Sequence, residues 1–147
     1  PNGLMRIGLY SSIGRHRWNN LRDIIPLDLS DELIPNFIRE RRLEILVDST
    51  ENIVTSIADF YSVSGCRDLL YHSNEIQFSI PEITKILEKL NLKFLGFANL
   101  SESVLTNFNM KFASNDDYYN LKKWEIFEQG QPDTFLAMYQ FWCQAND

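Results

Sequence analysis

The sequence predicts an α/β fold with few strands and a predominantly helical remainder. Residues 4–10, LMRIGLY, are apolar on both faces except at Arg6, which is typical of a strand buried in a parallel sheet. A helix followed directly by a second apolar strand is predicted between Ser79 and Phe97, and this order is half of a β-α-β unit. Most other segments carry apolar residues at helical spacing.

Residues 79–97 hold the strongest local signal. Ser79 and Glu82 have the spacing of a capping box, and Pro81 lies in the first turn, where its missing N–H costs little. The apolar positions then follow helical spacing: Ile83, Ile86, Leu87 and Leu90. Asn91 can adopt the left-handed conformation that ends a helix, so LKFLGF is predicted to form the strand.

A helix with an early break is predicted over residues 30–46. Ser30 is a good N-cap, but Pro35 predicts a kink near Ile34, so the helix is expected from about Asn36 to Leu46. Its predicted apolar face consists of Phe37, Ile38, Leu43 and Leu46. A further short helix is predicted over residues 49–60.

Three helices are predicted in the C-terminal third. The first is capped by Ser101, and the second covers residues 115–130 and ends at Gly130. The third covers residues 131–144, and its predicted apolar face carries Phe135, Met138, Tyr139 and Trp142. An aromatic stripe at helical spacing is typical of a core and not of a cofactor site.

Size and composition favour one globular domain, residues 1–147. The chain is 44% hydrophobic and 13% aromatic, and its net charge of −6 disfavours nucleic acid as a partner. Cys66 and Cys143 have no paired spacing, so neither a zinc site nor a disulfide framework is indicated, and a cytoplasmic location is predicted. No run of 18 apolar residues is present, so no membrane association is expected. Because the chain opens with Pro1, we expect it to be a piece of a longer protein.

The segment DFYSVSGCRDLLYH, residues 59–72, concentrates polar side chains. Asp68 and His72 are spaced i, i+4 on a predicted helix, where they could pair and supply an acid or a base. A short helix capped by Ser64, with Cys66 on its apolar stripe, explains the same residues without any chemistry. Both interpretations stay open on the residues alone.

Several reaction classes lack their motifs. There is no G-x-S-x-G elbow, no G-x-G-x-x-G loop and no P-loop pattern. His16 and His72 are the only histidines, so no metal site is predicted. A hydrolase that uses Cys66 or a serine with His72 is therefore the weakest of the hypotheses considered.

Four segments resemble the C-terminal part of bacterial class I S-adenosylmethionine-dependent methyltransferases, notably those attached to tetratricopeptide-repeat proteins. The segments are NGLMRIGLYS, DFYSVSGCRDLLYH, FSIPEITKILEKLNLKFLGF and PDTFLAMYQFW. They leave residues 13–57 and 98–130 weakly matched. The pattern DFYS-x-SGCRDLL-x-H is the most specific of the four.

The resemblance implies the C-terminal portion of a Rossmann-like, seven-stranded sheet. Residues 4–10 would be its fifth strand, residues 80–90 its last helix and residues 92–97 its sixth strand, with a helical insertion on the substrate side at about residues 13–75. The glycine-rich loop and the acidic residue that bind S-adenosylmethionine would precede Pro1. We therefore expect the longer parent protein to bind this cofactor and this chain alone to be inactive, with no cofactor-binding residues of its own.

The resemblance also implies roles for individual residues. Asp59 or His72 would accept the proton of the methyl acceptor, whose identity the sequence does not give. The residues implied to position the acceptor are Tyr10, Ser11, Ser12, Tyr61, Arg67 and Asp68. The alternative is a noncatalytic helical interaction module that forms a homodimer through exposed apolar surface.

Overall fold

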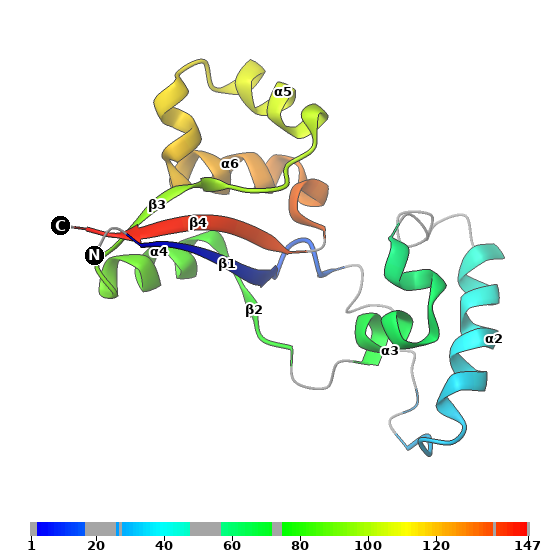
Figure 1. The fold of residues 1–147 in the computed structure, drawn as a ribbon. Helices are drawn as coiled ribbons and strands as arrows, with labels where there is room; N and C mark the ends of the chain where they lie inside the picture. The colour runs from blue at the N-terminus through cyan, green and yellow to red at the C-terminus, as the bar shows by residue number, and fades with distance from the viewer. Residues whose placement is uncertain are drawn as a thin grey trace. The chain divides into compact units, whose positions relative to one another are not determined.

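The computed structural model describes residues 3–16, 26, 28–47, 57–71, 75–136 and 138–146 (Figure 1). The chain divides into two compact units. Residues 1–16 and 76–147 make up the first, called the sheet unit below, and residues 17–75 make up the second, called the helical unit. The helical unit falls within the insertion that the sequence predicts at about residues 13–75. Each unit is described by itself.

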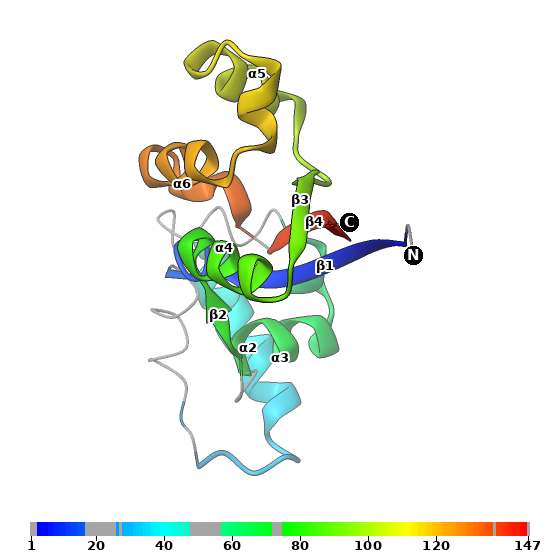
Figure 2. The same ribbon diagram turned by 90° about the vertical axis from the view of Figure 1, so that its left-hand side faces the viewer.

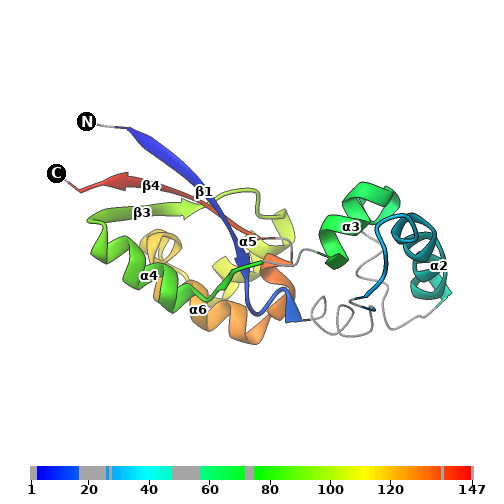
Figure 3. The same ribbon diagram turned by 90° about the horizontal axis from the view of Figure 1, so that it is seen from below.

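The sheet unit is built on a four-stranded mixed sheet in the order β2-β1-β4-β3. The strands are β1 (Leu4–Ser11), β2 (Gln77–Phe78), β3 (Leu92–Phe97) and β4 (Tyr139–Ala145). β1 runs parallel to β2 and antiparallel to β4, and β4 runs antiparallel to β3. β1 and β3 therefore point the same way, and β4 lies between them (Figure 3). The predicted α/β class is confirmed at this level.

Three helices accompany the sheet, and the sequence signals place them well. They are α4 (Ile80–Lys89), α5 (Glu102–Lys111) and α6 (Leu121–Gly130), with short 3₁₀ turns η4 (Asn115–Tyr119) and η5 (Pro132–Phe135) before and after α6. The capping box of Ser79 and Glu82 opens α4, and Asn91 follows it with φ 52°, as predicted. Ser101 caps α5 and Gly130 ends α6 as predicted, but Asn120 caps α6, so the expected helical residues 115–119 form the separate turn η4.

The predicted C-terminal helix is wrong. Residues 139–145 form strand β4, in which Tyr139, Phe141 and Cys143 are buried while Trp142 is exposed. This alternation has the period of two that a strand with one covered face requires. The predicted stripe does not form one face. Phe135 belongs to η5, and Tyr139 and Trp142 lie three apart in a strand, so their side chains face opposite sides of the sheet.

One face of the sheet is covered and the other is open. Helices α4 and α6 pack on the same face (Figure 3), which carries the buried side chains of β3 and β4. Strand β1, predicted to be buried on both faces, exposes Leu4 and Met5, and no described helix of the sheet unit covers the opposite face. The apolar run was misread because a strand with one uncovered face can carry apolar residues on its solvent-facing side.

Aromatic side chains fill the core between α5, α6 and the sheet. Trp124 is fully buried and stacks on Phe108 with ring centroids 3.8 Å apart. Its indole N–H donates to the Tyr118 carbonyl oxygen (2.8 Å), and the Tyr118 hydroxyl donates to the Phe97 carbonyl oxygen (2.6 Å). These two hydrogen bonds tie η4 to α6 and to the end of β3. On this side of the sheet, α6 lies between the sheet and α5 (Figure 2).

The helical unit contains α2 (Ile34–Val47), the 3₁₀ turn η3 (Ala58–Tyr61) and α3 (Val63–Tyr71). A turn precedes α2 as predicted, with the Leu33 N–H donating to the Ser30 carbonyl oxygen (3.0 Å). The helix begins at Ile34, two residues earlier than expected, so Pro35 lies in its first turn, where no N–H donor is needed, and does not break it. Its buried residues are Ile34, Ile38 and Ile45, whereas Leu43 and Leu46 of the predicted face are exposed. Most of the helix predicted at residues 49–60 lies outside the described residues.

Candidate functional site

The carboxyl ends of β1, β2 and β3 lie along one border of the sheet, because these three strands run in the same direction. In open α/β sheets ligands bind outside these ends. Ser11 is the last residue of β1 and is paired with Phe78, the last residue of β2. Ser12 follows, half-buried, and its N–H donates to the Phe78 carbonyl oxygen (2.9 Å). The polar groups near Ser11 therefore define the candidate site.

A fully buried hydrogen-bonded group closes the end of β1. The Ser11 hydroxyl donates to Glu128 Oε1 (2.7 Å), and the Tyr139 hydroxyl lies 2.7 Å and 2.8 Å from the two carboxyl oxygens of Glu128. The two hydroxyl oxygens are 3.0 Å apart. All three side chains are at most 1% exposed. We call these residues the buried triad: it joins β1, α6 and the start of β4.

Burial sets the proton affinities of the buried triad. Loss of solvent raises the pKa of Glu128 above its ordinary value, although the hydrogen bonds from Ser11 and Tyr139 act in the opposite direction. Burial, followed by the nearby Glu128 charge, raises the pKa of the Tyr139 hydroxyl, which therefore stays protonated and donates. The triad is consequently an anchor whose charge depends on Glu128 alone.

The turn after β1 is tied to the buried triad. The Gly14 N–H donates to the Ser11 hydroxyl oxygen and the Arg15 N–H donates to the Ser11 carbonyl oxygen, both at 2.9 Å. A Cβ at Gly14 would lie 2.3 Å from the Phe135 carbonyl oxygen, so only glycine allows this close approach. Arg15 is 3% exposed, and its guanidinium carbon lies 4.4 Å from the centre of the Tyr10 ring.

The sequence-predicted polar residues 59–72 belong to the helical unit. Asp59, Tyr61 and Asp68 are exposed, and Arg67 is also exposed and pairs with Asp31 at 3.2 Å. An exposed pair of this kind contributes little to stability. These side chains are accessible to a ligand, as an acceptor-positioning role requires. The predicted roles of Asp59, Tyr61, Arg67 and Asp68 stay predictions.

Helix α3 begins two residues earlier than predicted. Ser62 caps it, with the Gly65 N–H donating to the Ser62 hydroxyl oxygen (2.9 Å), and the predicted cap Ser64 is already within the helix. The predicted apolar stripe is confirmed, because Cys66, Leu69 and Leu70 are buried. Burial raises the pKa of the Cys66 thiol although Arg42 lowers it, which disfavours the thiolate that a nucleophile requires. His72, and with it the predicted pairing with Asp68, lies outside the described residues.

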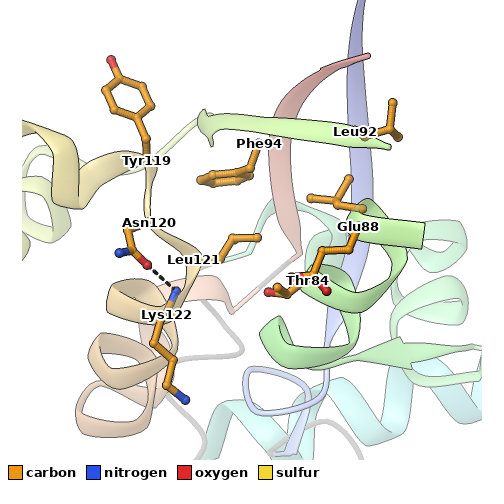
Figure 4. A pocket seen from close by; sticks show the side chains of 9 residues that line it. Thr84, Glu88, Leu92, Phe94, Tyr119, Asn120, Leu121 and Lys122 are labelled. Atoms are coloured by element: carbon orange, nitrogen blue, oxygen red, sulfur yellow. Dashed lines mark hydrogen bonds between the residues drawn. The ribbon is translucent and has the colours of Figure 1, made fainter. Parts of the chain in front are cut away.

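A pocket of about 400 Å³ opens between α4, β3 and the start of α6 (Figure 4). Phe94 and Leu121 form its apolar floor, and Glu88 and Thr84 stand on the α4 side. The ammonium group of Lys122 points away and pairs with Glu125 at 2.8 Å. Asn120 Oδ1 accepts from the Lys122 N–H (3.0 Å), so that side chain is occupied in capping α6. The pocket shares no residue with the buried triad.

Sequence reasoning placed Ser11 at the site but missed Glu128, Tyr139 and Arg15. A signal for Glu128 exists, because it continues the face of α6 on which Leu121 and Trp124 lie at positions i and i+3, with Glu128 at i+7. A carboxylate on an otherwise buried helical face requires hydrogen-bond donors. Tyr139 was assigned to a helix, so its partner could not be inferred.

The described residues contain no cluster of three or more His, Cys, Asp or Glu side chains that could hold a metal ion. None of the described helices combines the length and the apolar character needed to cross a bilayer. No protein-family model matches the chain. No curated protein matches it significantly. The resemblance to methyltransferases therefore stays a prediction.

Proposed function

We propose that this chain is the C-terminal, substrate-side part of a class I S-adenosylmethionine-dependent methyltransferase. The arrangement of the sheet carries the proposal: β1 and β3 are parallel, and the final strand β4 is inserted antiparallel between them. If β1 is the fifth strand and β3 the sixth, as the resemblance implies, β4 is the seventh strand of the sheet. β4 would then complete the seven strands that the resemblance implies.

The chemistry of methyl transfer suits the residues at the end of β1. The reaction is a displacement at a sulfonium carbon, and it depends on alignment of the acceptor and on removal of water from it. In this proposal the buried triad fixes the turn at residues 11–15, so that Tyr10 and Ser12 face the transfer site. Ser11, being fully buried, positions this turn and does not contact the acceptor.

The helical unit supplies the acceptor-binding side chains in this proposal. Tyr61, Arg67 and Asp68 position the acceptor, and Asp59 or His72 takes its proton. In this proposal S-adenosylmethionine is held by a glycine-rich loop and an acidic residue of the parent protein that precede Pro1, and no residue of this chain binds it. The parent protein is proposed to be a bacterial, cytoplasmic enzyme attached to tetratricopeptide repeats.

Titration of the cofactor tests the proposal. The protein encoded by the complete gene is expected to bind S-adenosylmethionine in calorimetry, whereas this chain alone is not. In the complete protein, Asp59→Ala and Arg67→Ala should lower turnover with cofactor affinity unchanged. Arg39→Ala is the matched control, because Arg39 is an exposed arginine of the same unit. Micromolar binding of S-adenosylmethionine by this chain alone would contradict its assignment to the substrate-side part of the enzyme.

The second candidate function is a noncatalytic interaction module that forms a homodimer. The observation in its favour is the exposure of Leu4 and Met5 on β1, at 61% and 43%. Light scattering discriminates the two candidates, because a dimerisation module gives a defined dimer with a single cooperative unfolding transition.

A further inference from the structure

Arg42 occupies a core position of helix α2. It lies four residues after Ile38 and three before Ile45, and both isoleucines are at most 1% exposed. Residues at this spacing share one face of a helix, and that face packs beside α3 in the helical unit (Figure 3). An apolar side chain is the usual occupant of such a position. The half-buried arginine therefore requires a reason other than packing.

The Arg42 guanidinium has no hydrogen-bond partner among the described residues. Its Nε is the only buried side-chain nitrogen or oxygen in the described part of the chain that lacks a partner. Such groups are rare in proteins, because an unsatisfied buried donor loses its hydration without compensation. The other described arginines of the helical unit each have a partner, which is Asn36 for Arg39, Glu44 for Arg41 and Asp31 for Arg67.

The groups beside the guanidinium do not neutralise its charge. The Arg42 guanidinium carbon lies 5.9 Å from the centre of the Phe60 ring, which is fully buried. The positive charge of Arg42 lowers the pKa of the Cys66 thiol, but burial raises that pKa by more, so the thiol stays protonated. No ion pair between described residues includes Arg42. The charge is thus held on an apolar surface without a counterion from the described residues.

We infer that Arg42 binds the carboxylate of a small organic acid where α2 meets η3. The two terminal nitrogens, unlike Nε, are not buried, so they can donate two parallel hydrogen bonds to the oxygens of one carboxylate. Tyr61 follows Phe60 in η3, and their ring centroids are 5.4 Å apart. The Tyr61 side chain is 56% exposed, so it offers the apolar part of the acid a contact surface.

The charges near Arg42 favour a singly charged anion. Arg39 and Arg41 are engaged with partners on α2, so Arg42 supplies the one unpaired positive charge of that helix. Asp59 is exposed and directly precedes Phe60. A phosphate group carries about −1.5 to −2 charges at pH 7, and the Asp59 carboxylate would repel it without a second cation to balance it. A carboxylate carries a single negative charge, which one guanidinium balances.

The inference adds a substrate class to the proposed function. If the helical unit holds the methyl acceptor, as proposed, that acceptor carries a carboxylate group. Only this identification rests on the proposed function, because binding of an acid at Arg42 requires neither the cofactor nor the parent protein. Failure of cofactor binding in the complete protein would leave the acid site intact, and failure of acid binding at Arg42 would leave the methyltransferase assignment intact.

NMR of the arginine Nε–H groups tests the inference on this chain, with sodium benzoate as the probe. Benzoate joins a carboxylate to an apolar ring, and its addition should shift the Arg42 Nε–H signal and leave that of Arg39 in place. Arg42→Met keeps an unbranched apolar side chain and should weaken benzoate binding at least about tenfold. The matched control is Arg39→Met, which changes an exposed arginine of the same helix and should leave the affinity unchanged.

Two further probes identify the recognised group. Benzamide has the shape of benzoate without its charge, and inorganic phosphate has charge without the planar carboxylate. Each should bind at least about tenfold more weakly than benzoate.

Hydrogen exchange of the α2 amides separates ligand binding from packing. Replacing an unpaired, half-buried charge by an apolar side chain of similar size is neutral or stabilising. Arg42→Met should therefore leave the protection of the amides of Ile38 and Ile45 unchanged or increase it, although it removes benzoate binding.

Any of the following results would overturn the inference. An Arg42 Nε–H signal that benzoate leaves in place, or equal benzoate affinities of Arg42→Met and Arg39→Met, would exclude Arg42 as the binding group. Benzamide that binds as tightly as benzoate would show that the charge is not recognised. Tighter binding of phosphate would exclude a site for carboxylates. Reduced protection of the α2 amides in Arg42→Met would make the guanidinium a structural group of the core.

Discussion

Removing the Tyr139 hydroxyl should destabilise the sheet unit through the buried triad. The hydroxyl lies 2.7 Å and 2.8 Å from the oxygens of Glu128, and Tyr139→Phe would leave this carboxyl group with the Ser11 hydroxyl as its remaining described side-chain donor. A buried hydrogen bond to a charged group contributes about 1.5–3 kcal/mol. For a chain of this size that loss lowers the melting temperature by roughly 2–4 °C per kcal/mol.

The assay is urea unfolding followed by tryptophan fluorescence, because Trp124 is fully buried in the sheet unit. Tyr119→Phe is the control: Tyr119 belongs to the same unit and is 56% exposed, and its hydroxyl makes no hydrogen bond to a described residue. Loss of this hydroxyl should change the free energy of unfolding by less than about 0.5 kcal/mol. A double-mutant cycle of Tyr139→Phe with Glu128→Gln should give a coupling of about 0.5–3 kcal/mol. Zero coupling, or equal costs for Tyr139→Phe and Tyr119→Phe, would refute the reasoning.

The buried carboxyl group of Glu128 should make the stability of the protein depend on pH. Because the pKa of Glu128 is raised in the folded protein, folding favours its protonated form, and this contribution is fully present below the unfolded pKa, about 4.5. It is lost as the pH rises through the folded value. The free energy of unfolding of the natural chain, relative to Glu128→Gln, should therefore decrease as the pH increases above about 4.5. A constant difference between pH 4 and 8 would contradict the raised pKa.

Three further predictions concern single residues. Gly14→Ala should lower the free energy of unfolding by about 1–3 kcal/mol in chemical unfolding, because its Cβ would lie 2.3 Å from the Phe135 carbonyl oxygen. Gly3→Ala is the control, because nothing lies within 4 Å of its Cβ position. A smaller loss for Gly14→Ala than for Gly3→Ala would contradict the close approach. Ser79→Ala should cost about 1 kcal/mol because it removes the capping box of α4, and an unchanged urea midpoint would contradict this. Cys66 should react with a thiol reagent only after unfolding, because burial raises its pKa, and rapid labelling of the native chain would revive a nucleophilic role.

Local signals in the sequence predicted the elements that they control. The capping box at Ser79, the left-handed Asn91 and the cap at Ser101 rest on interactions within a few residues, and each is present in the structure. Strand β4 depends on pairing with residues far away in the sequence. In this short aromatic segment, positions 135, 139 and 142 match the spacing of a helix, whereas positions 139, 141 and 143 show the period of two of the strand that forms.

The candidate site, like strand β4, depends on contacts between residues far apart in the sequence. Ser11 could be placed because it directly follows an apolar run that reads as a strand. Glu128 and Tyr139 join it across 117 and 128 positions of sequence, and no local pattern encodes such a meeting. The strand order β2-β1-β4-β3, on which the functional proposal rests, is likewise a property of long-range pairing.

The central position of β4 has a consequence for how the sheet unit assembles. Leu4 at the start of β1 pairs with Gln144 near the C-terminal end of β4, so the strand that holds β1 and β3 together is synthesised after both of them. Closing such a long loop is entropically costly and slows folding. Until residues 139–145 leave the ribosome, β1 and β3 have no common neighbour, and the nascent chain must keep both strands from pairing elsewhere.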